Sequence, residues 1–211
     1  MGQTFDENYF KKALYREVPN SPRNRKRLAE AVRLRPAGGR LLEVGCAEGG
    51  FLSLAAAHFD VQGIDASEYA VRTVRERYRL PAEVSDIESA ALPASAFDVI
   101  AAFNVLEHLA DPAPAVGRLF DALKPGGALI GSVPNNGGFI GRPAALIGNR
   151  LDRSHRSALP PSAWRGIFAS AGFASIRFFG ELNLGRNRGV YIRRPAWKHL
   201  AIGLVFICEK C

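Results

Sequence analysis

The sequence predicts an α/β fold with a largely parallel sheet, and three observations support this prediction. First, short apolar runs typical of buried strands alternate with segments of helical periodicity from residue 40 to residue 133. Second, the first apolar run breaks into a turn of small residues, 45–49, and an apolar helix follows directly. Third, the run Val61 to Ile64 ends in Asp65, about 20 residues after the turn. The turn and the carboxylate indicate a ligand site at the strand ends, where the helix N-terminus supplies amide N–H groups.

Two helices are expected before the first strand. Residues 7–15 have the composition of a short helix. Ser21 and Pro22 resemble a helix N-cap followed by proline at the first helical position. The apolar stripe of this second helix is formed by Leu28, Ala31, Val32 and Leu34. Residues 36–39 break the helix, so we expect residues 1–36 to form an N-terminal helical cap and residues 37–211 the main domain.

The central region alternates regularly between the two kinds of element. The expected strands are 40–45, 61–64, 82–84, 97–103 and 128–133. The expected helices are 49–58, 67–79 and 112–123. Ser67 suits the N-cap of the second helix, and Pro112 suits the first turn of the third. Strands that alternate with helices through right-handed crossovers form a parallel sheet.

The pattern changes after residue 133. Residues 134–160 carry many glycines, prolines and arginines and little regular periodicity. A loop of this length within a compact domain is typical of a functional segment, and we interpret it as a substrate lid. A helix over 162–171 ends at Gly172, and two β-rich runs, 173–179 and 199–208, follow it.

The charge of the chain leaves several partner classes open. The 211 residues are 47% hydrophobic and 23% charged, as in ordinary globular domains, and the formal net charge is +8. This basic excess is compatible with nucleic acid, an anionic membrane surface, an acidic substrate or simply solvated faces. The stretch 185–198, in which Tyr191 and Trp197 lie among arginines, is the candidate for a peripheral membrane contact. Nothing in the sequence indicates the oligomeric state.

A cytoplasmic location is expected. The N-terminus is polar and lacks the apolar stretch of a signal peptide, and no run approaches the roughly 18 apolar residues of a membrane span. The chain has three cysteines, and an odd number without a framework argues against a disulfide scaffold. Cys208 and Cys211 have no second pair, so a zinc or redox role is not expected for them.

Taken in order, the motifs resemble the class I S-adenosylmethionine (SAM)-dependent methyltransferases over roughly residues 38–210. The elements that carry the resemblance are Glu43-x-Gly45-x-Ala47-x-Gly49, Asp65, Ser85-Asp86, Phe97-Asp98-Val99-Ile100, Asn104-Val105-Leu106-Glu107-His108-Leu109, Leu123-Lys124-Pro125-Gly126-Gly127 and Ala171-Gly172-Phe173. The resemblance implies a Rossmann-like, doubly wound, seven-stranded sheet whose last strand is antiparallel and inserted beside strand six. It also implies SAM as the cofactor.

The turn departs from the family pattern at Ala47, where the family usually has glycine. Alanine tolerates a positive φ poorly, so we expect the turn to be adjusted there. A nicotinamide dinucleotide is the rival ligand, because a strand, turn and helix would serve it equally well. The segment 45–50 fits the G-x-G-x-x-G fingerprint of dinucleotide sites poorly, and the Leu123 to Gly127 turn also favours the methyltransferase.

The resemblance assigns a cofactor site residue by residue. The implied cofactor-binding residues are Glu43, Gly45, Cys46, Ala47, Gly49, Asp65, Ala66, Asp86, Ile87, Phe103 and Asn104. Glu43 would hold the amino group of SAM, although it could instead be a strand-end acid in a local hydrogen bond. Asp65 would accept the ribose hydroxyls, because a carboxylate can take both. Asp86 would accept the adenine amino group, or it could be an ordinary helix cap.

Two histidines are candidates for a base that activates an acceptor hydroxyl. His155 lies in the 134–160 loop, and His108 follows the fourth strand. No metal is expected, because Asn104 stands where metal-binding relatives carry a glutamate. The implied activity is transfer of a methyl group to a small molecule, most simply at oxygen, as in ubiquinone-biosynthesis O-methyltransferases. The alternatives are an RNA or protein methyltransferase and a non-catalytic SAM-binding or membrane-associated protein.

Overall fold

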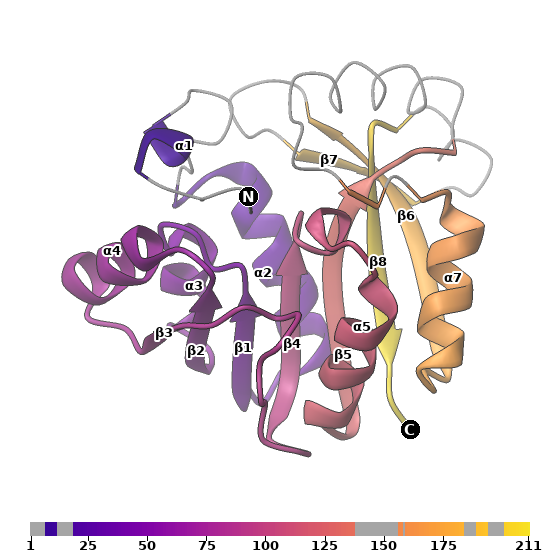
Figure 1. The fold of residues 1–211 in the computed structure, drawn as a ribbon, viewed down its shortest axis with the longest axis horizontal. Helices are drawn as coiled ribbons and strands as arrows, with labels where there is room; N and C mark the ends of the chain where they lie inside the picture. The colour runs from indigo at the N-terminus through magenta and orange to yellow at the C-terminus, as the bar shows by residue number, and fades with distance from the viewer. Residues whose placement is uncertain (1–6, 12–18, 138–155, 158, 184–188, 194–200) are drawn as a thin grey trace.

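The strands described in the computed structural model belong to one mixed sheet (Figure 1). The structure describes residues 7–11, 19–137, 156–157, 159–183, 189–193 and 201–211. The strands are β1 (Arg40–Val44), β2 (Asp60–Asp65), β3 (Ala82–Val84), β4 (Phe97–Phe103), β5 (Leu123–Pro134), β6 (Ser175–Asn183), β7 (Gly189–Ile192) and β8 (Gly203–Glu209). They are ordered β3-β2-β1-β4-β5-β8-β6-β7.

The topology confirms the predicted fold class. Strands β1 to β5 pair in parallel, and β8 is antiparallel to both of its neighbours, β5 and β6. The last strand of the chain is thus inserted beside the sixth, as the resemblance implied. Within the described residues, the sheet has eight strands rather than seven, because β7 adds an edge strand to β6. This strand has only four residues in a basic stretch, where no apolar alternation marks it.

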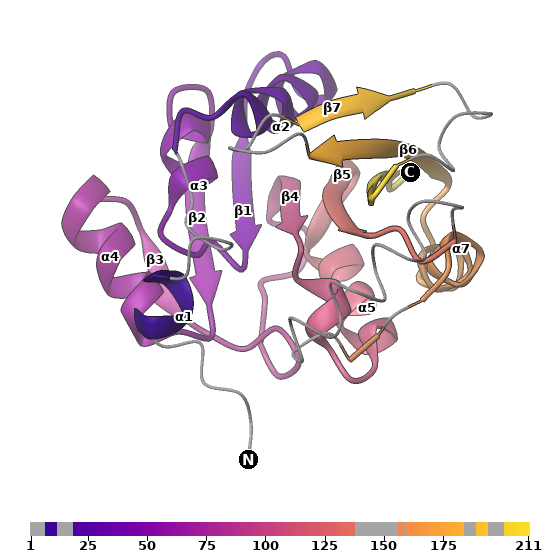
Figure 2. The ribbon, with the colours of Figure 1, turned by 90° about the horizontal axis from the view of Figure 1, so that it is seen from above.

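Helices cover both faces of the sheet (Figure 2). They are α1 (Glu7–Lys11), α2 (Pro22–Leu34), α3 (Gly50–Ala55), α4 (Glu68–Tyr78), the 3-10 turn η1 (Leu106–His108), α5 (Pro112–Ala122) and α7 (Pro161–Ser170). The side chains of Ser21, Ser67 and Asp111 cap α2, α4 and α5 by accepting backbone N–H groups. None of the described helices is long and apolar enough to cross a membrane.

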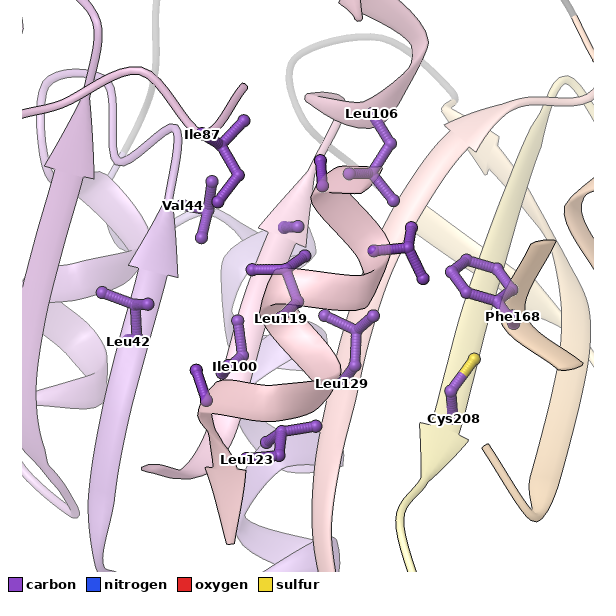
Figure 3. Packing of buried hydrophobic residues seen from close by; sticks show 14 of the residues in the cluster. Leu42, Val44, Ile87, Ile100, Leu106, Leu119, Leu123, Leu129, Phe168 and Cys208 are labelled. Atoms are coloured by element: carbon purple, nitrogen blue, oxygen red, sulfur yellow. The ribbon is translucent and has the colours of Figure 1, made fainter. Parts of the chain in front are cut away.

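Alternation along the central strands supplies one hydrophobic core on each face of the sheet. Leu42 and Val44 of β1 join Ile100 of β4 under α5 and α7, where Leu119 and Phe168 are buried (Figure 3). Residues of β1 with the opposite orientation form the second core with α2, α3 and α4. This second core includes Leu41, Val99, Ala31, Phe51, Leu52, Val71 and Val74. Burial on both faces fixes the register of the central strands, and so the position of the loops that follow them.

Candidate functional site

The turn after β1 forms the centre of the candidate site, at the edge where the parallel strands end (Figure 1). Gly45 has a φ of 67° and donates its N–H to the carbonyl oxygen of Ile64 at 2.8 Å. Cys46 donates to the same oxygen at 3.1 Å, so the turn is fastened to the end of β2. Gly49, with a φ of 80°, is the N-cap of α3. Positive φ at these two positions is the reason that glycine is needed there.

Ala47 adopts a left-handed conformation, with a φ of 46°. The expected adjustment away from this conformation is therefore not seen. Instead, the Ala47 N–H donates to Oδ2 of Asp65 at 2.9 Å, and this bond offsets the strain of a positive φ in a residue with a Cβ. A hydrogen bond thus joins the turn to the carboxylate, two features that the sequence indicated separately.

Asp65 ends β2 and is 8% exposed. Its Oδ1 accepts the N–H of Ser67 at 2.9 Å, while its Oδ2 accepts that of Ala47. Burial raises the pKa of Asp65, and the two backbone hydrogen bonds oppose this only in part. A carboxylate has about four acceptor positions, so two backbone bonds leave capacity for a pair of hydroxyl donors.

Glu43 in β1 and Cys46 in the turn that follows it are both buried. Glu43 is buried in the middle of the sheet, in register with Gly63 of β2 and Ala101 of β4. Cys46 is also buried, and a Cβ at Gly63 would lie only 2.9 Å from its sulfur. The Cys46 side chain is therefore part of the core, which leaves its backbone as the part available to a ligand.

The loop after β4 packs directly against the turn after β1. A Cβ at Gly45 would lie 2.4 Å from Cγ2 of Val105. Asn104, which precedes Val105, has a φ of 56° and is exposed. The Phe103 ring points into the second core instead, 5.1 Å from the Phe51 ring and with the Arg27 guanidinium 4.1 Å above its centre. Phe103 therefore offers backbone rather than side chain to a ligand.

The segment after β3 lies beside Asp65, because the Ser85 N–H donates to the Asp65 carbonyl at 2.9 Å. Asp86 is exposed and accepts the Glu88 N–H through Oδ1 at 2.9 Å. Residues 87–89 form a turn and not a helix, so Asp86 is not the helix cap that the sequence left open. Ile87 is buried in the first core (Figure 3), and Ala66 is exposed. Contact of these three residues with an adenine stays a prediction.

His108 is half-buried at the end of η1, on the rim that follows β4. The backbone carbonyl of Glu107 accepts two N–H groups, from Arg156 and Ser157, each at 2.9 Å. The Ser157 hydroxyl also donates to the Leu109 carbonyl at 2.6 Å. The end of the 134–160 segment is therefore fixed to η1, although His155 and residues 138–155 as a whole lie outside the described residues. Across the described ranges, no three His, Cys, Asp or Glu side chains are grouped to hold a metal ion.

The first helix covers part of this edge. Phe10 of α1 is buried and stacks on Tyr69 of α4, with ring centres 5.8 Å apart. The Tyr69 hydroxyl donates to the Glu48 carboxylate in the turn at 3.3 Å. Helix α1 thus lies near the turn (Figure 2), while the role of residues 1–36 as a cap stays a prediction.

The described part of the basic stretch 185–198 packs against α2. Arg193 forms an ion pair with Glu30, and the Tyr191 ring lies 5.1 Å from that of Phe179. Arg23 of α2 binds both carboxylate oxygens of Glu181 on β6, at 2.9 and 2.7 Å. Residues 184–188 and 194–200 lie outside the described residues. Membrane contact and nucleic-acid binding therefore both remain predictions.

Comparison with known proteins agrees with this geometry. The family model described as a methyltransferase domain matches residues 12–177. A probable SAM-dependent methyltransferase of Mycolicibacterium smegmatis is 40% identical over 103 residues, which are 48% of this chain and 40% of that protein. A ubiquinone biosynthesis O-methyltransferase of Aromatoleum aromaticum is 37% identical over 107 residues, covering 47% and 45%. The chain spans about half the length of the curated relatives it matches.

Solved structures share the fold at low sequence identity. A SAM-dependent methyltransferase of Archaeoglobus fulgidus superposes with a TM-score of 0.69 at 18% identity, covering 97% of this chain and all of the other. A SAM-dependent methyltransferase of Thermotoga maritima gives a TM-score of 0.69 at 16% identity, covering 90% and 98%. At these identities the likeness establishes the fold alone.

Proposed function

This chain belongs to the methyltransferase domain family, and from that premise we propose that it transfers a methyl group from SAM to a small-molecule acceptor, at oxygen. Bound SAM would supply a methyl group activated by a sulfonium. The protein then has to align the acceptor with that methyl group and to exclude water.

One observation carries the assignment of SAM to this edge of the sheet. The Asp65 carboxylate is bonded to the backbone of the turn after β1, and its unused acceptor positions suit the two hydroxyls of a ribose. The amides of residues 45–49 would line the methionine part, and Glu43 would hold its amino group. Asp86, Ile87 and Ala66 would surround the adenine.

Oxygen as the acceptor atom is supported by the relative from Aromatoleum aromaticum, which is described as a ubiquinone biosynthesis O-methyltransferase. Methylation of a hydroxyl benefits from a base, and His155 and His108 are our candidates. We propose further that residues 134–160 act as the lid over the acceptor. The base role predicts that His155→Ala lowers turnover at unchanged SAM affinity, and unchanged turnover would reject it.

Calorimetric titration with SAM tests the cofactor assignment. We expect the wild-type protein to bind SAM and Asp65→Ala to lose about a hundredfold in affinity, because a hydrogen-bonded charged group is removed. Asp60→Ala is the matched control, since Asp60 begins the same strand at the opposite edge and its side chain is 77% exposed. Absence of binding at millimolar SAM, or equal losses in the two variants, would overturn the proposal.

A further inference from the structure

We propose that the Asn104 side chain donates a hydrogen bond to the acceptor oxygen, that Ser132 holds it in this orientation, and that the pair selects oxygen over amine nitrogen. This inference rests on the proposed methyltransferase function. It assigns Asn104 as a specificity-determining residue and Ser132 as a positioning residue, which the sequence did not single out.

The two residues come from neighbouring parallel strands. Phe103 at the end of β4 is in register with Ser132 of β5. The next residue, Asn104, donates its backbone N–H to the Ser132 carbonyl at 2.8 Å. Its φ of 56° is uncommon for a residue with a side chain, and asparagine is among the few that tolerate it. This conformation turns the chain at the strand end and places the side chain at the edge of the sheet.

A buried hydroxyl then fixes the orientation of the carboxamide. Ser132 is 2% exposed, and its Oγ donates to Oδ1 of Asn104 at 3.0 Å. Because the carboxamide is planar, turning Oδ1 toward Ser132 directs the two Nδ2 hydrogens to the other side of the group. Asn104 itself is exposed, so this side of the group presents donors to the space at the strand ends.

The position of these donors matches the proposed reaction site. Val105, the next residue, is in contact distance of the turn that would line the methionine part of SAM, since a Cβ at Gly45 would be 2.4 Å from Val105 Cγ2. The Asn104 carboxamide therefore lies beside the part of the site where the transferred methyl group is expected.

The difference between oxygen and nitrogen acceptors follows from their lone pairs. An oxygen has a lone pair to attack the methyl carbon and another to accept a hydrogen bond from Asn104. A neutral amine has a single lone pair, which the attack uses, and its N–H groups need acceptors. The Asn104 oxygen already accepts the Ser132 hydroxyl, so the pair presents donors where an amine would require an acceptor.

Methyl transfer from SAM to the acceptor oxygen needs no further reactant. The acceptor oxygen forms a bond to the methyl carbon while the carbon–sulfur bond breaks, and its electron pair remains on sulfur as a neutral thioether. The acceptor hydroxyl loses its proton to a histidine base or to water. Asn104 keeps both of its Nδ2 hydrogens, and by hydrogen bonding to the ionised oxygen it lowers the pKa of the bound hydroxyl.

A pair of isosteric acceptors tests the inference. We would supply 3,4-dihydroxybenzoate and 3,4-diaminobenzoate with SAM and identify the methylated products by mass spectrometry. The wild-type protein is expected to methylate the dihydroxy compound alone. Transfer to the diamine, or to neither compound while SAM still binds, would overturn the inference and leave the proposed SAM binding intact. Failure to bind SAM would overturn the proposed function itself.

The positioning role is read from the pH profile. Ser132→Ala is expected to lower kcat/KM at neutral pH about tenfold. The acid limb of the pH profile of kcat/KM should move up by about one pH unit. SAM affinity should change less than about twofold. Ser132→Thr restores the hydroxyl and should restore the profile. Ser175→Ala is the matched control, because Ser175 begins strand β6 and pairs with Glu209 of β8, which also pairs with Ala128, four residues before Ser132 in β5. A lower rate at all pH values without a shifted limb would mean that Ser132 is merely structural.

Discussion

Two carboxylates at opposite ends of the parallel strands, Asp98 and Asp65, have pKa values shifted in opposite directions. At the edge where the parallel strands begin, Asp98 accepts the Arg40 N–H at 2.8 Å and the Lys124 ammonium at 2.7 Å. Its slight burial would raise the pKa, but Lys124, the Arg40 N–H and Arg35 together lower it. At the edge where the strands end, burial dominates and the pKa of Asp65 is raised.

This difference indicates that Asp98 stabilises the fold, whereas Asp65 is placed to bind a ligand. Asp98 is satisfied by cations of the chain itself, so its charge favours the folded state. Within the described part of the chain, the hydrogen bonds to the Asp65 carboxylate come from the backbone N–H groups of Ala47 and Ser67, and burial still raises its pKa. A ligand that donates further hydrogen bonds would favour the ionised form. The second arrangement is expected where a binding site is built at the expense of stability.

The largest expected effect is at Gly45, where the two loops of the strand-end edge touch. Gly45→Val places a side chain at a φ of 67° and 2.4 Å from Val105 Cγ2. We expect a loss of about 3 kcal/mol or more in the free energy of unfolding, measured by denaturant titration. Gly117→Ala in α5 is the matched control, because its added Cβ meets nothing within 4 Å. A Gly45→Val protein of wild-type stability would contradict the close packing of the two loops.

The next effect is at Asp65, where stability and affinity should respond in opposite senses. The pKa of Asp65 is higher in the folded than in the unfolded state, so ionising this carboxyl opposes folding. Its contribution to stability is therefore present below the unfolded-state pKa and is lost as pH rises through the folded-state pKa. Asp65→Asn is therefore expected to leave the melting temperature unchanged or higher at neutral pH. SAM affinity should fall at least about tenfold by calorimetry. A large drop in melting temperature would show that Asp65 serves the fold.

Asp98 should show the opposite pH dependence. Its lowered pKa contributes stability that is present above the unfolded-state pKa and lost as pH falls through the folded-state pKa. Asp98→Asn is expected to cost about 1 kcal/mol at neutral pH, because the partly exposed ion pair with Lys124 is broken. The difference from wild type should vanish in acid, when the wild-type carboxyl is protonated. A constant difference across pH would argue against the ionic origin.

The smallest effect is expected at Gly117 itself. Alanine has a higher helix propensity than glycine, and Gly117 lies within α5 with open space at its Cβ. We expect Gly117→Ala to raise the free energy of unfolding by roughly 0.5–1 kcal/mol without changing SAM affinity. Loss of SAM binding in this variant would mean that α5 is coupled to the strand-end edge.

The parts of this molecule that local sequence encodes were predictable. Strand alternation, the caps Ser21 and Ser67, and the small-residue turn with its following carboxylate are local patterns, and the structure has each of them. The edge strand β7 was missed because four residues among arginines carry no clear period. Ser132 was missed because its role depends on a partner 28 positions away in the sequence, which only the strand register brings together.

Hydrogen exchange of backbone amides with and without SAM tests most directly whether the strand-end edge is the cofactor site. We expect added SAM to slow exchange at residues 45–49 and 65–67, where the amides and Asp65 would hold it. Exchange at Arg40 and Asp98, on the opposite edge, should stay the same. Slower exchange at Arg40 and Asp98 alone, or no change at 45–49 and 65–67 at saturating SAM, would contradict the assignment.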